Sequence, residues 1–230
     1  MIKYETDPIR IKNASFEIIR EQISLSCNSQ HQYFDSLKKE EQEMAVEMIQ
    51  ASGDLSILEN LRFSEAVIEK SLIALEEDYD LLCDTETVIC GLKQKYLKDD
   101  PICFINKANV ITQAKTNKNT RSMTAIDLWK RYLSDSIILI GSEPTALFRL
   151  MEILETLKKD QDEGLPALII ATPSGFTGAL EAKQYLWEKQ EKLGVPCITL
   201  LGTRGDNNLA STAMNNLLKL SAEASLKPEL

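Results

Sequence analysis

Short segments rich in glycine and hydroxyl side chains carry the chemistry that this sequence suggests. They read CDTET, GSEPT, TPSGFTG and GTRGDN, and each directly follows a short apolar run. Glycine lets a ligand approach the backbone closely, and the free amides at the start of a following helix attract negative groups. We therefore expect an anionic small molecule to bind here, although each segment alone is equally compatible with an ordinary tight turn. None of the segments matches the glycine patterns of nucleotide sites, so a nucleotide cofactor is not expected.

A further candidate is the segment NTRSM, in which Arg121 stands beside the start of a predicted helix. A guanidinium group forms paired, charge-assisted hydrogen bonds with a carboxylate, so Arg121 is suited to an acidic ligand. The alternative is an ordinary surface arginine in a loop. Ser122 is predicted to cap the helix that follows.

Five short apolar runs predict the strands that must position these segments: DLLCD, ICFI, SIILIG, ALIIAT and CITLLG. The runs alternate with amphipathic stretches, which is typical of a parallel sheet covered by helices. The near absence of polar residues within them indicates burial on both sides. We expect a three-layer α/β fold with a mostly parallel, doubly wound sheet and an N-terminal helical segment. In such a sheet the ligand crevice lies outside the carboxyl ends of the strands.

The first third of the chain is predicted to be helical. Apolar residues recur at helical spacing over residues 11–23 and 37–53, and Gly53 is a plausible stop for the second helix. Ser64 is predicted to cap the next helix, and Pro144 fits the first position of a later one. The only histidine, His31, falls in a polar stretch that is predicted to be a solvated loop.

Length and composition favour a single domain, residues 1–230, with two small domains as the alternative. No apolar run reaches the roughly 18 to 20 residues of a membrane span, and the start lacks a secretory signal, so we expect a cytoplasmic protein. The net charge of -9 disfavours nucleic-acid binding. The odd number of scattered cysteines indicates neither disulfides nor a metal site, and we expect all five to be buried hydrophobic residues: Cys27, Cys83, Cys90, Cys103 and Cys197.

The order and spacing of several motifs resemble the precorrin-8X methylmutases. The motifs are ASFEII, LCDTETV, NTRS, GSEPTALF, PSGFTGALEAK and GTRGDNN, and the resemblance covers about residues 11–220. It implies an isomerase of cobalamin biosynthesis that moves a methyl group within precorrin-8X from C-11 to C-12, giving hydrogenobyrinic acid. In cobalt-first pathways the analogous substrate already holds the metal. The resemblance also implies a homodimer and no cofactor.

The resemblance assigns roles to particular residues. A macrocycle with many carboxylates needs many separate donors, and the implied substrate-binding residues are Thr85, Glu86, Arg121, Ser122, Thr145, Ser174, Gly175 and Arg204. Ser15 and Gln50 are the implied catalytic residues. No metal ligand is implied.

Gln50 is the main departure from the family. The family segment M-[IV]-H-x-x-G-D appears here as MIQASGD, so a carboxamide stands in place of the histidine thought to protonate the ring system. A carboxamide can orient a ligand but does not donate a proton as imidazolium does. His31 is an alternative proton donor. Glu143 and Asp206 add negative charge in two loops where the family has none. The alternative function is therefore a corrinoid-binding homologue with impaired catalysis.

Overall fold

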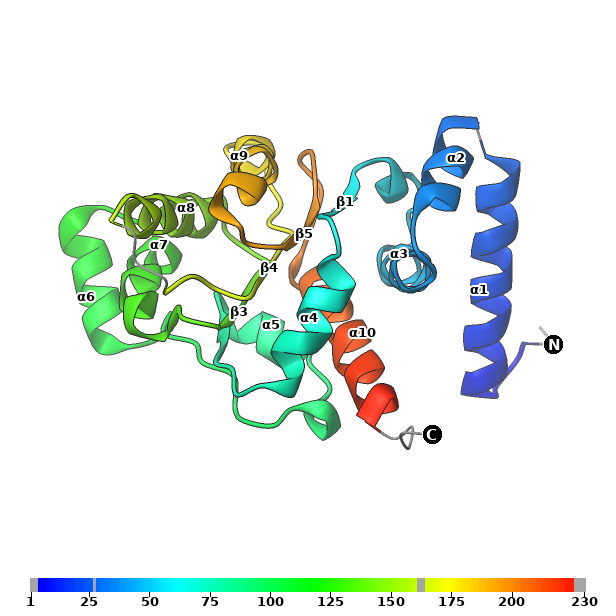
Figure 1. Cartoon of the computed structure of the whole chain (residues 1–230), viewed down its shortest axis with the longest axis horizontal. Coiled ribbons are helices and arrows are strands. Elements are labelled where there is room, and N and C mark those ends of the chain that lie inside the picture. The colour runs from blue at the N-terminus through cyan, green and yellow to red at the C-terminus, as the bar shows by residue number, and fades with distance from the viewer. Residues whose placement is uncertain (1–3, 27, 161–163, 226–230) are drawn as a thin grey trace. The chain divides into compact units, whose positions relative to one another are not determined.

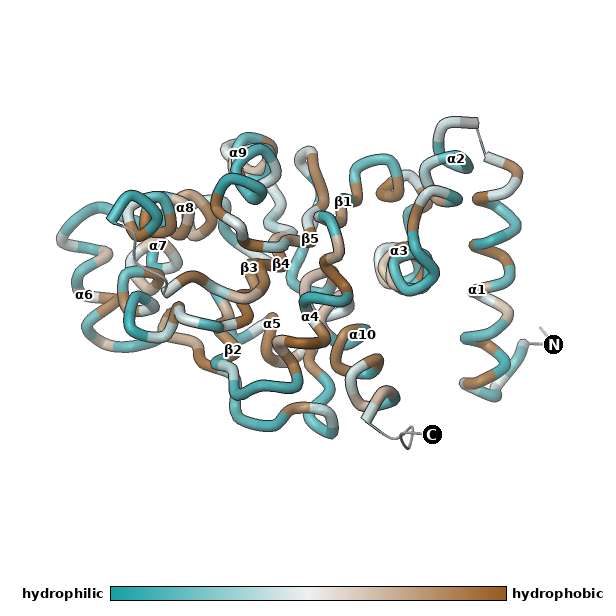
Figure 2. Tube along the Cα trace, in the orientation of Figure 1, coloured by the Kyte–Doolittle hydropathy of each residue, from teal (hydrophilic) through white to brown (hydrophobic). Residues whose placement is uncertain are grey.

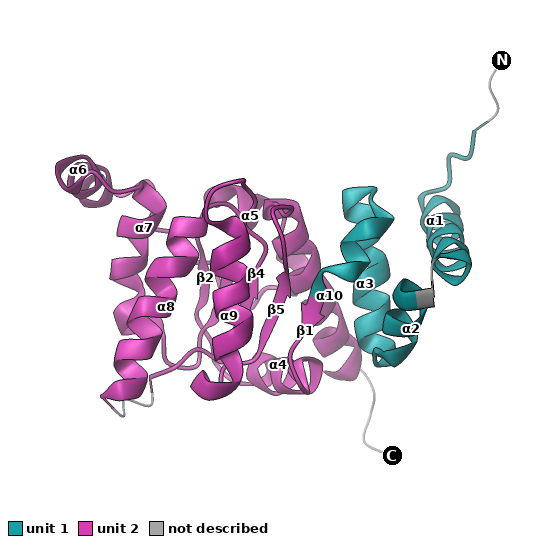
Figure 3. Ribbon diagram, turned by 90° about the horizontal axis from the view of Figure 1, so that it is seen from above, with its two compact units in different colours: residues 1–61 teal, residues 62–230 magenta. Residues whose placement is uncertain are grey.

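A computed structural model describes residues 4–26, 28–160 and 164–225. The chain divides into two compact units, residues 1–61 and 62–230 (Figures 1 and 3). The prediction of a single domain over residues 1–230 stays a prediction. Within the described residues, every helix is too short or too polar to traverse a bilayer.

Unit 1, residues 1–61, is helical. It contains the helices α1 (Pro8–Leu25), α2 (Asn28–Ser36) and α3 (Lys39–Ser52), followed by the 3₁₀ turn η1 (Leu55–Glu59). Helix α1 packs on α3, and Lys12 forms an ion pair of 3.0 Å with Glu47 between them. Gly53 ends α3 in the left-handed conformation with φ 65°, as predicted.

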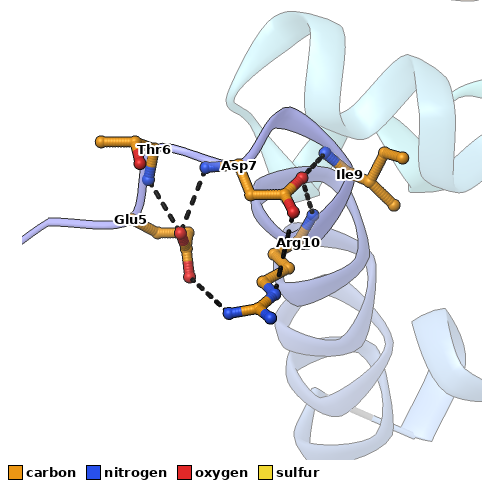
Figure 4. Close-up of polar contacts among 5 residues, drawn as sticks. All are labelled: Glu5, Thr6, Asp7, Ile9 and Arg10. Carbon is orange, nitrogen blue, oxygen red and sulfur yellow. Dashed lines mark hydrogen bonds and ion pairs between the residues drawn. The ribbon is translucent and has the colours of Figure 1, made fainter.

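The start of α1 is fixed by a local polar cluster (Figure 4). The Asp7 carboxylate accepts hydrogen bonds from the amides of Ile9 at 2.8 Å and Arg10 at 3.4 Å. The Glu5 carboxylate accepts from the amides of Thr6 and Asp7, and the Arg10 guanidinium approaches both carboxylates. Acidic side chains at this end accept hydrogen bonds from free amides and interact favourably with the positive end of the helix dipole. The first turn of α1 is therefore defined.

Unit 2, residues 62–230, is built on a five-stranded sheet with the order β1-β5-β4-β3-β2. The strands are β1 (Leu61–Phe63), β2 (Leu81–Cys83), β3 (Ile137–Ile140), β4 (Leu168–Ala171) and β5 (Cys197–Leu200). Strands β2 to β5 pair in parallel. All their residues are buried, as the unbroken apolar runs predicted, and Figure 2 shows the hydrophobic strands between more polar helices.

Helices cover both faces of this sheet (Figure 1). One layer contains α7 (Arg121–Ile126), α8 (Pro144–Lys159) and α9 (Ala179–Leu193). The other contains α4 (Val67–Glu76), α5 (Glu86–Cys90) and α10 (Asn207–Ser225). Successive steps from β2 to β5 run in one direction across the sheet, so right-handed crossovers place α8 and α9 on one face. The step from β1 to β2 runs in the opposite direction and places α4 on the other face of the sheet. The predicted fold class is confirmed.

Two further helical elements join β2 to β3. They are α6 (Ala108–Asn117) and η3 (Asp127–Tyr132), on either side of α7, while η2 (Gln94–Tyr96) follows α5. Trp129 of η3 is fully buried in the core between the sheet and the helix layer of α8. Pro144 occupies the first turn of α8, as predicted.

Several local predictions were wrong. The segment ICFI makes only an isolated parallel bridge, Leu82 with Ile102, while the strand β1 was missed. Ser64 does not cap α4, which begins after Ala66 in the left-handed conformation. Instead the Ser64 hydroxyl accepts the Cys197 amide at 2.8 Å and satisfies a buried donor of β5. His31 lies in α2 rather than in a loop, where its ring contacts Asp35 at 3.3 Å.

The cysteines only partly follow the prediction. Cys83 and Cys197 are buried, whereas Cys90 is exposed and Cys103 is intermediate. Burial raises the pKa of the Cys197 thiol to about 12, so this side chain stays protonated and apolar in character. Cys27 lies outside the described residues.

Candidate functional site

The glycine- and hydroxyl-rich segments gather at one edge of the sheet. They follow β2, β3, β4 and β5, which are parallel, so all leave the sheet at its carboxyl edge. This is where open α/β sheets place their ligands. The prediction that these segments share one edge is therefore confirmed.

A buried carboxylate joins the first two segments. Asp84 follows β2, is 1% exposed, and accepts the amides of Gly141 at 3.1 Å, Ser142 at 2.9 Å and Glu143 at 3.4 Å. Burial raises the pKa of Asp84 above its usual value, while the three amide hydrogen bonds act in the opposite direction. Asp84 thereby fixes the turn that leads from β3 into α8.

The segments after β4 and β5 are joined by three further hydrogen bonds. The Thr172 hydroxyl donates to the carbonyl of Asp206 at 2.9 Å, and the Gly175 amide donates to that of Thr203 at 2.9 Å. The ammonium group of Lys183 on α9 donates to the carbonyl of Arg204 at 2.6 Å. Each of these donors lies on the stretch that begins with β4, and each acceptor lies after β5.

Gly205 is required by the close approach of these two segments. Its φ of 151° is unfavourable for other residues, and a Cβ atom there would collide with the Thr172 carbonyl. Asp206, which follows, accepts the Leu209 amide at 2.7 Å through its side chain. This acidic residue therefore caps the start of α10, and its charge serves the fold of the loop.

One more hydrogen bond ties the first pair of segments to the second. The Thr85 hydroxyl donates to the Asn207 carboxamide at 2.9 Å, joining the start of α5 to the start of α10. Gly141 lies against the same residue, since a Cβ atom there would stand 2.7 Å from the Asn207 Cα atom. The carboxyl edge is thus a continuous hydrogen-bonded rim.

A cavity of about 360 Å³ opens at the β2–β3 side of this rim. Its volume falls within the roughly 300 to 1,000 Å³ of small-molecule sites. The lining is mostly polar: Thr85, Glu86, Thr87, Ile105, Asn106, Thr120, Arg121, Ser122, Ser142 and Glu143.

Arg121 is the cation of this cavity, and its backbone is well fixed. Thr120 caps α7 by accepting the Met123 amide at 3.1 Å, and its hydroxyl also lies 2.7 Å from that of Thr145 on α8. Arg121 is therefore the first residue of α7. Among the described residues its guanidinium makes a single 3.5 Å contact, with Asn106, and the side chain is exposed, so most of its donors can meet an acidic ligand. The prediction that Ser122 caps this helix was wrong, because Thr120 does so.

A thiol borders the cavity but is not activated. Burial, with the nearby charges of Glu86 and Asp84, raises the pKa of Cys103 to about 11. A thiol of this kind is protonated near neutral pH and is a poor nucleophile. Within residues 4–26, 28–160 and 164–225, no three potential ligands cluster in a way that could hold a metal ion.

The predicted site residues fall into three groups. Thr85, Glu86, Arg121 and Ser122 line the cavity, and Thr145 touches its lining residue Thr120. Ser174, Gly175 and Arg204 lie on the segments after β4 and β5, at the same edge of the sheet.

The remaining two belong to unit 1. Gln50 is exposed in the last turn of α3, and the Ser15 hydroxyl donates to the Ile11 carbonyl at 2.8 Å within α1.

Sequence reasoning missed Asp84, Thr120 and Lys183. The position of Asp84 directly after an apolar run is the signal that could have pointed to it. Lys183 stands in an amphipathic, charge-rich helix where a lysine is normally exposed, so no local signal separates it from its neighbours.

Comparisons with known proteins decide the family. The model of the family described as CbiC, precorrin-8X methylmutase, matches residues 10–220. The chain belongs to the precorrin-8X methylmutase family. This match spans both compact units.

Similar proteins agree with this assignment. A precorrin-8X methylmutase of Pseudomonas aeruginosa is 34% identical over 94% of this chain and 98% of its own length. A cobalt-precorrin-8 methylmutase of Leptospira interrogans is 30% identical over 93% of this chain and 94% of its own. The crystal structure of the Thermus thermophilus precorrin-8X methyl mutase superposes with a TM-score of 0.76 at 26% identity, covering 96% of this chain and 99% of that one.

Replacing Asp84 by asparagine is expected to destabilise unit 2 by about 1–3 kcal/mol, because the new NH₂ group would face backbone donors. Both tryptophans, Trp129 and Trp187, lie in unit 2, so the urea midpoint followed by tryptophan fluorescence reports this change. Asp100→Asn, at an exposed position, is the matched control and should shift stability by less than about 0.5 kcal/mol. Equal midpoints for the two variants would contradict the role of Asp84.

Lys183 should make stability depend on pH. Burial lowers the pKa of its ammonium group from 10.5 to about 8 in the folded chain. Below pH 8 both states are charged and the cost of burial is complete. Between about pH 8 and pH 10.5 only the unfolded chain keeps the proton on Lys183, so the free energy of unfolding rises with pH by at most about 1.4 kcal/mol per pH unit. Lys183→Met lacks this gain, and the stability of wild type relative to the variant should increase from about pH 7.5 to about pH 9.5 in urea unfolding. A constant difference would count against the burial of a titrating amine.

Proposed function

We propose that this chain is a precorrin-8X methylmutase, an isomerase of cobalamin biosynthesis. It moves a methyl group from C-11 to C-12 of the macrocycle and releases hydrogenobyrinic acid. The single observation that carries the proposal is the family match over residues 10–220, with relatives of that activity up to 34% identical along nearly their whole length.

The carboxyl edge offers what such a substrate needs. A macrocycle bearing many carboxylates is held by separate donors around its periphery, and the rim supplies backbone amides, hydroxyls and two arginines, Arg121 and Arg204. The cavity of about 360 Å³ accommodates part of the macrocycle, with Arg121 and Ser122 as donors and with Thr85 in the lining beside them. Thr145, Ser174, Gly175 and Arg204 extend the contact along the rim.

The reaction itself asks for orientation and proton transfer rather than for a cofactor. A methyl shift within one molecule adds and removes no atoms overall, so no second substrate is consumed. We propose that Gln50 orients the ring by hydrogen bonds and that Ser15 assists it. The substrate is precorrin-8X or its cobalt-containing analogue, since relatives with both names are similar to this chain.

The setting of the enzyme is part of the same proposal. We expect a homodimer in the cytoplasm, in keeping with an enzyme of a biosynthetic pathway. The alternative of a corrinoid-binding protein with impaired catalysis has no support in the comparisons, where the similar proteins described above are methylmutases.

The direct test is turnover. Purified protein is mixed with precorrin-8X, and in parallel with the cobalt-containing analogue, and the visible spectrum is followed until the product spectrum of the corrin appears. No conversion of either compound beyond a protein-free control would overturn the proposed function.

Arg121→Ala is expected to raise KM about tenfold or more while leaving the fold intact, because a charge-assisted contact to a substrate carboxylate is lost. Arg131→Ala is the matched control, since Arg131 is exposed on η3 and stacks on Tyr132. Steady-state kinetics and circular dichroism of both variants check the prediction. Unfolding of Arg121→Ala would show instead that this residue is structural.

Gln50→His is expected to raise the isomerisation rate, by up to about 10² to 10⁴-fold, because imidazolium supplies a proton that the carboxamide does not. The rate is measured under single-turnover conditions across pH, where the variant should gain dependence on a group titrating near neutrality. Gln42→His, on the same helix, is the control. A rate unchanged in Gln50→His would mean that protonation at this position is not limiting.

A further inference from the structure

Lys183 is a buried cation that has no part in the proposed reaction. Its side chain is 0% exposed in the second turn of α9. Burying an ammonium group is costly unless it is paired, and within the described residues its one hydrogen bond is to the Arg204 carbonyl at 2.6 Å. Methionine could fill a similar space without that cost, which shows that packing alone does not require a lysine here.

The acceptor of this hydrogen bond lies on a segment with little regular structure of its own. Residues 202–206 join β5 to α10 and include Gly202 and Gly205, both with positive φ. Two neighbouring carbonyls, of Thr203 and Asp206, are held by Gly175 and Thr172. The Arg204 carbonyl, which lies between them in the sequence, accepts a hydrogen bond from the Lys183 side chain of α9.

The charge of the donor has a consequence for this segment. A hydrogen bond from an ammonium group is about twice as strong as a neutral one, and here it lies in the interior rather than in water. It therefore fixes the peptide unit of Arg204, an exposed residue at the carboxyl edge. Where the backbone of Arg204 is fixed, the volume that its guanidinium can reach is limited.

We propose that Lys183 is a positioning residue that holds Arg204 at the carboxyl edge for a carboxylate of the substrate. The proposal rests on the proposed function for the identity of the ligand, but not for the geometry. Lys183 acts through the Arg204 carbonyl and does not itself touch the substrate.

The decisive experiment is a double-mutant cycle on binding of hydrogenobyrinic acid, measured by titration. Lys183→Met and Arg204→Ala should each raise Kd about tenfold. The double variant should bind no more weakly than Arg204→Ala alone, because the effect of Lys183 passes through Arg204. Additive effects of the two changes would overturn the proposal. Lys192→Met, on the exposed last turn of the same helix, should leave Kd unchanged.

A second measurement does not depend on the ligand. In Lys183→Met, amide hydrogen exchange should accelerate in residues 202–206 and remain unchanged in β3 and β4. Unchanged exchange in residues 202–206 would overturn the proposal. If the methionine variant does not fold, Lys183→Leu, which also lacks an N–H donor, is measured in its place with the same two outcomes. Absence of hydrogenobyrinic acid binding by the wild type would count against the proposed function, whereas the exchange experiment would still decide the role of Lys183.

Discussion

The hydrogen bonds between neighbouring strand ends are the constraint on which the carboxyl edge depends. A parallel sheet delivers its loops to one edge, but it does not fix their conformations. Here the Asp84 carboxylate collects three amides of the β3–α8 turn, and the Thr172, Gly175 and Lys183 donors hold three carbonyls after β5. The hydrogen bond between Thr85 and Asn207 joins the two sets. The site is therefore a network of contacts between distant parts of the sequence.

This dependence explains which features could be predicted from the sequence. Unbroken apolar runs revealed β2 to β5, because burial on both faces removes polar residues from such strands. The common edge followed from the alternation with helices, which indicates parallel strands, whereas the strand order came only from the structure. The strand β1 was missed because its three residues, Leu61, Arg62 and Phe63, include a charged side chain and form no continuous apolar run. The segment ICFI was overpredicted because apolar content does not show whether a neighbouring strand is free to pair.

The site residues divide in the same way. Thr85 and Arg121 were accessible to sequence reasoning because hydroxyl and guanidinium groups next to strand ends or helix starts are typical of ligand sites. Lys183 was not, since its role depends on a partner 21 residues away. Asp84 was marked only by its place directly after an apolar run, because its first amide partner lies 57 residues away. Thr120 took the capping role predicted for Ser122 because the helix begins two residues earlier, at Arg121. Shifts of this size decide which side chain caps the helix.

The charges at the carboxyl edge determine where a protein with a net charge of -9 can bind a polyanion. Asp84 and Asp206 lie at this edge, yet their carboxylates accept backbone amides and cap turns, so much of their negative potential is compensated locally. Glu86 and Glu143 do line the cavity, together with Arg121. The carboxylates of a ligand must therefore avoid these two side chains. This directs them toward the amides and hydroxyls that border Arg121 on one side and toward Arg204 along the rim. Repulsion from these carboxylates thus adds to attraction by the arginines in orienting an acidic ligand, because it excludes the poses in which like charges meet.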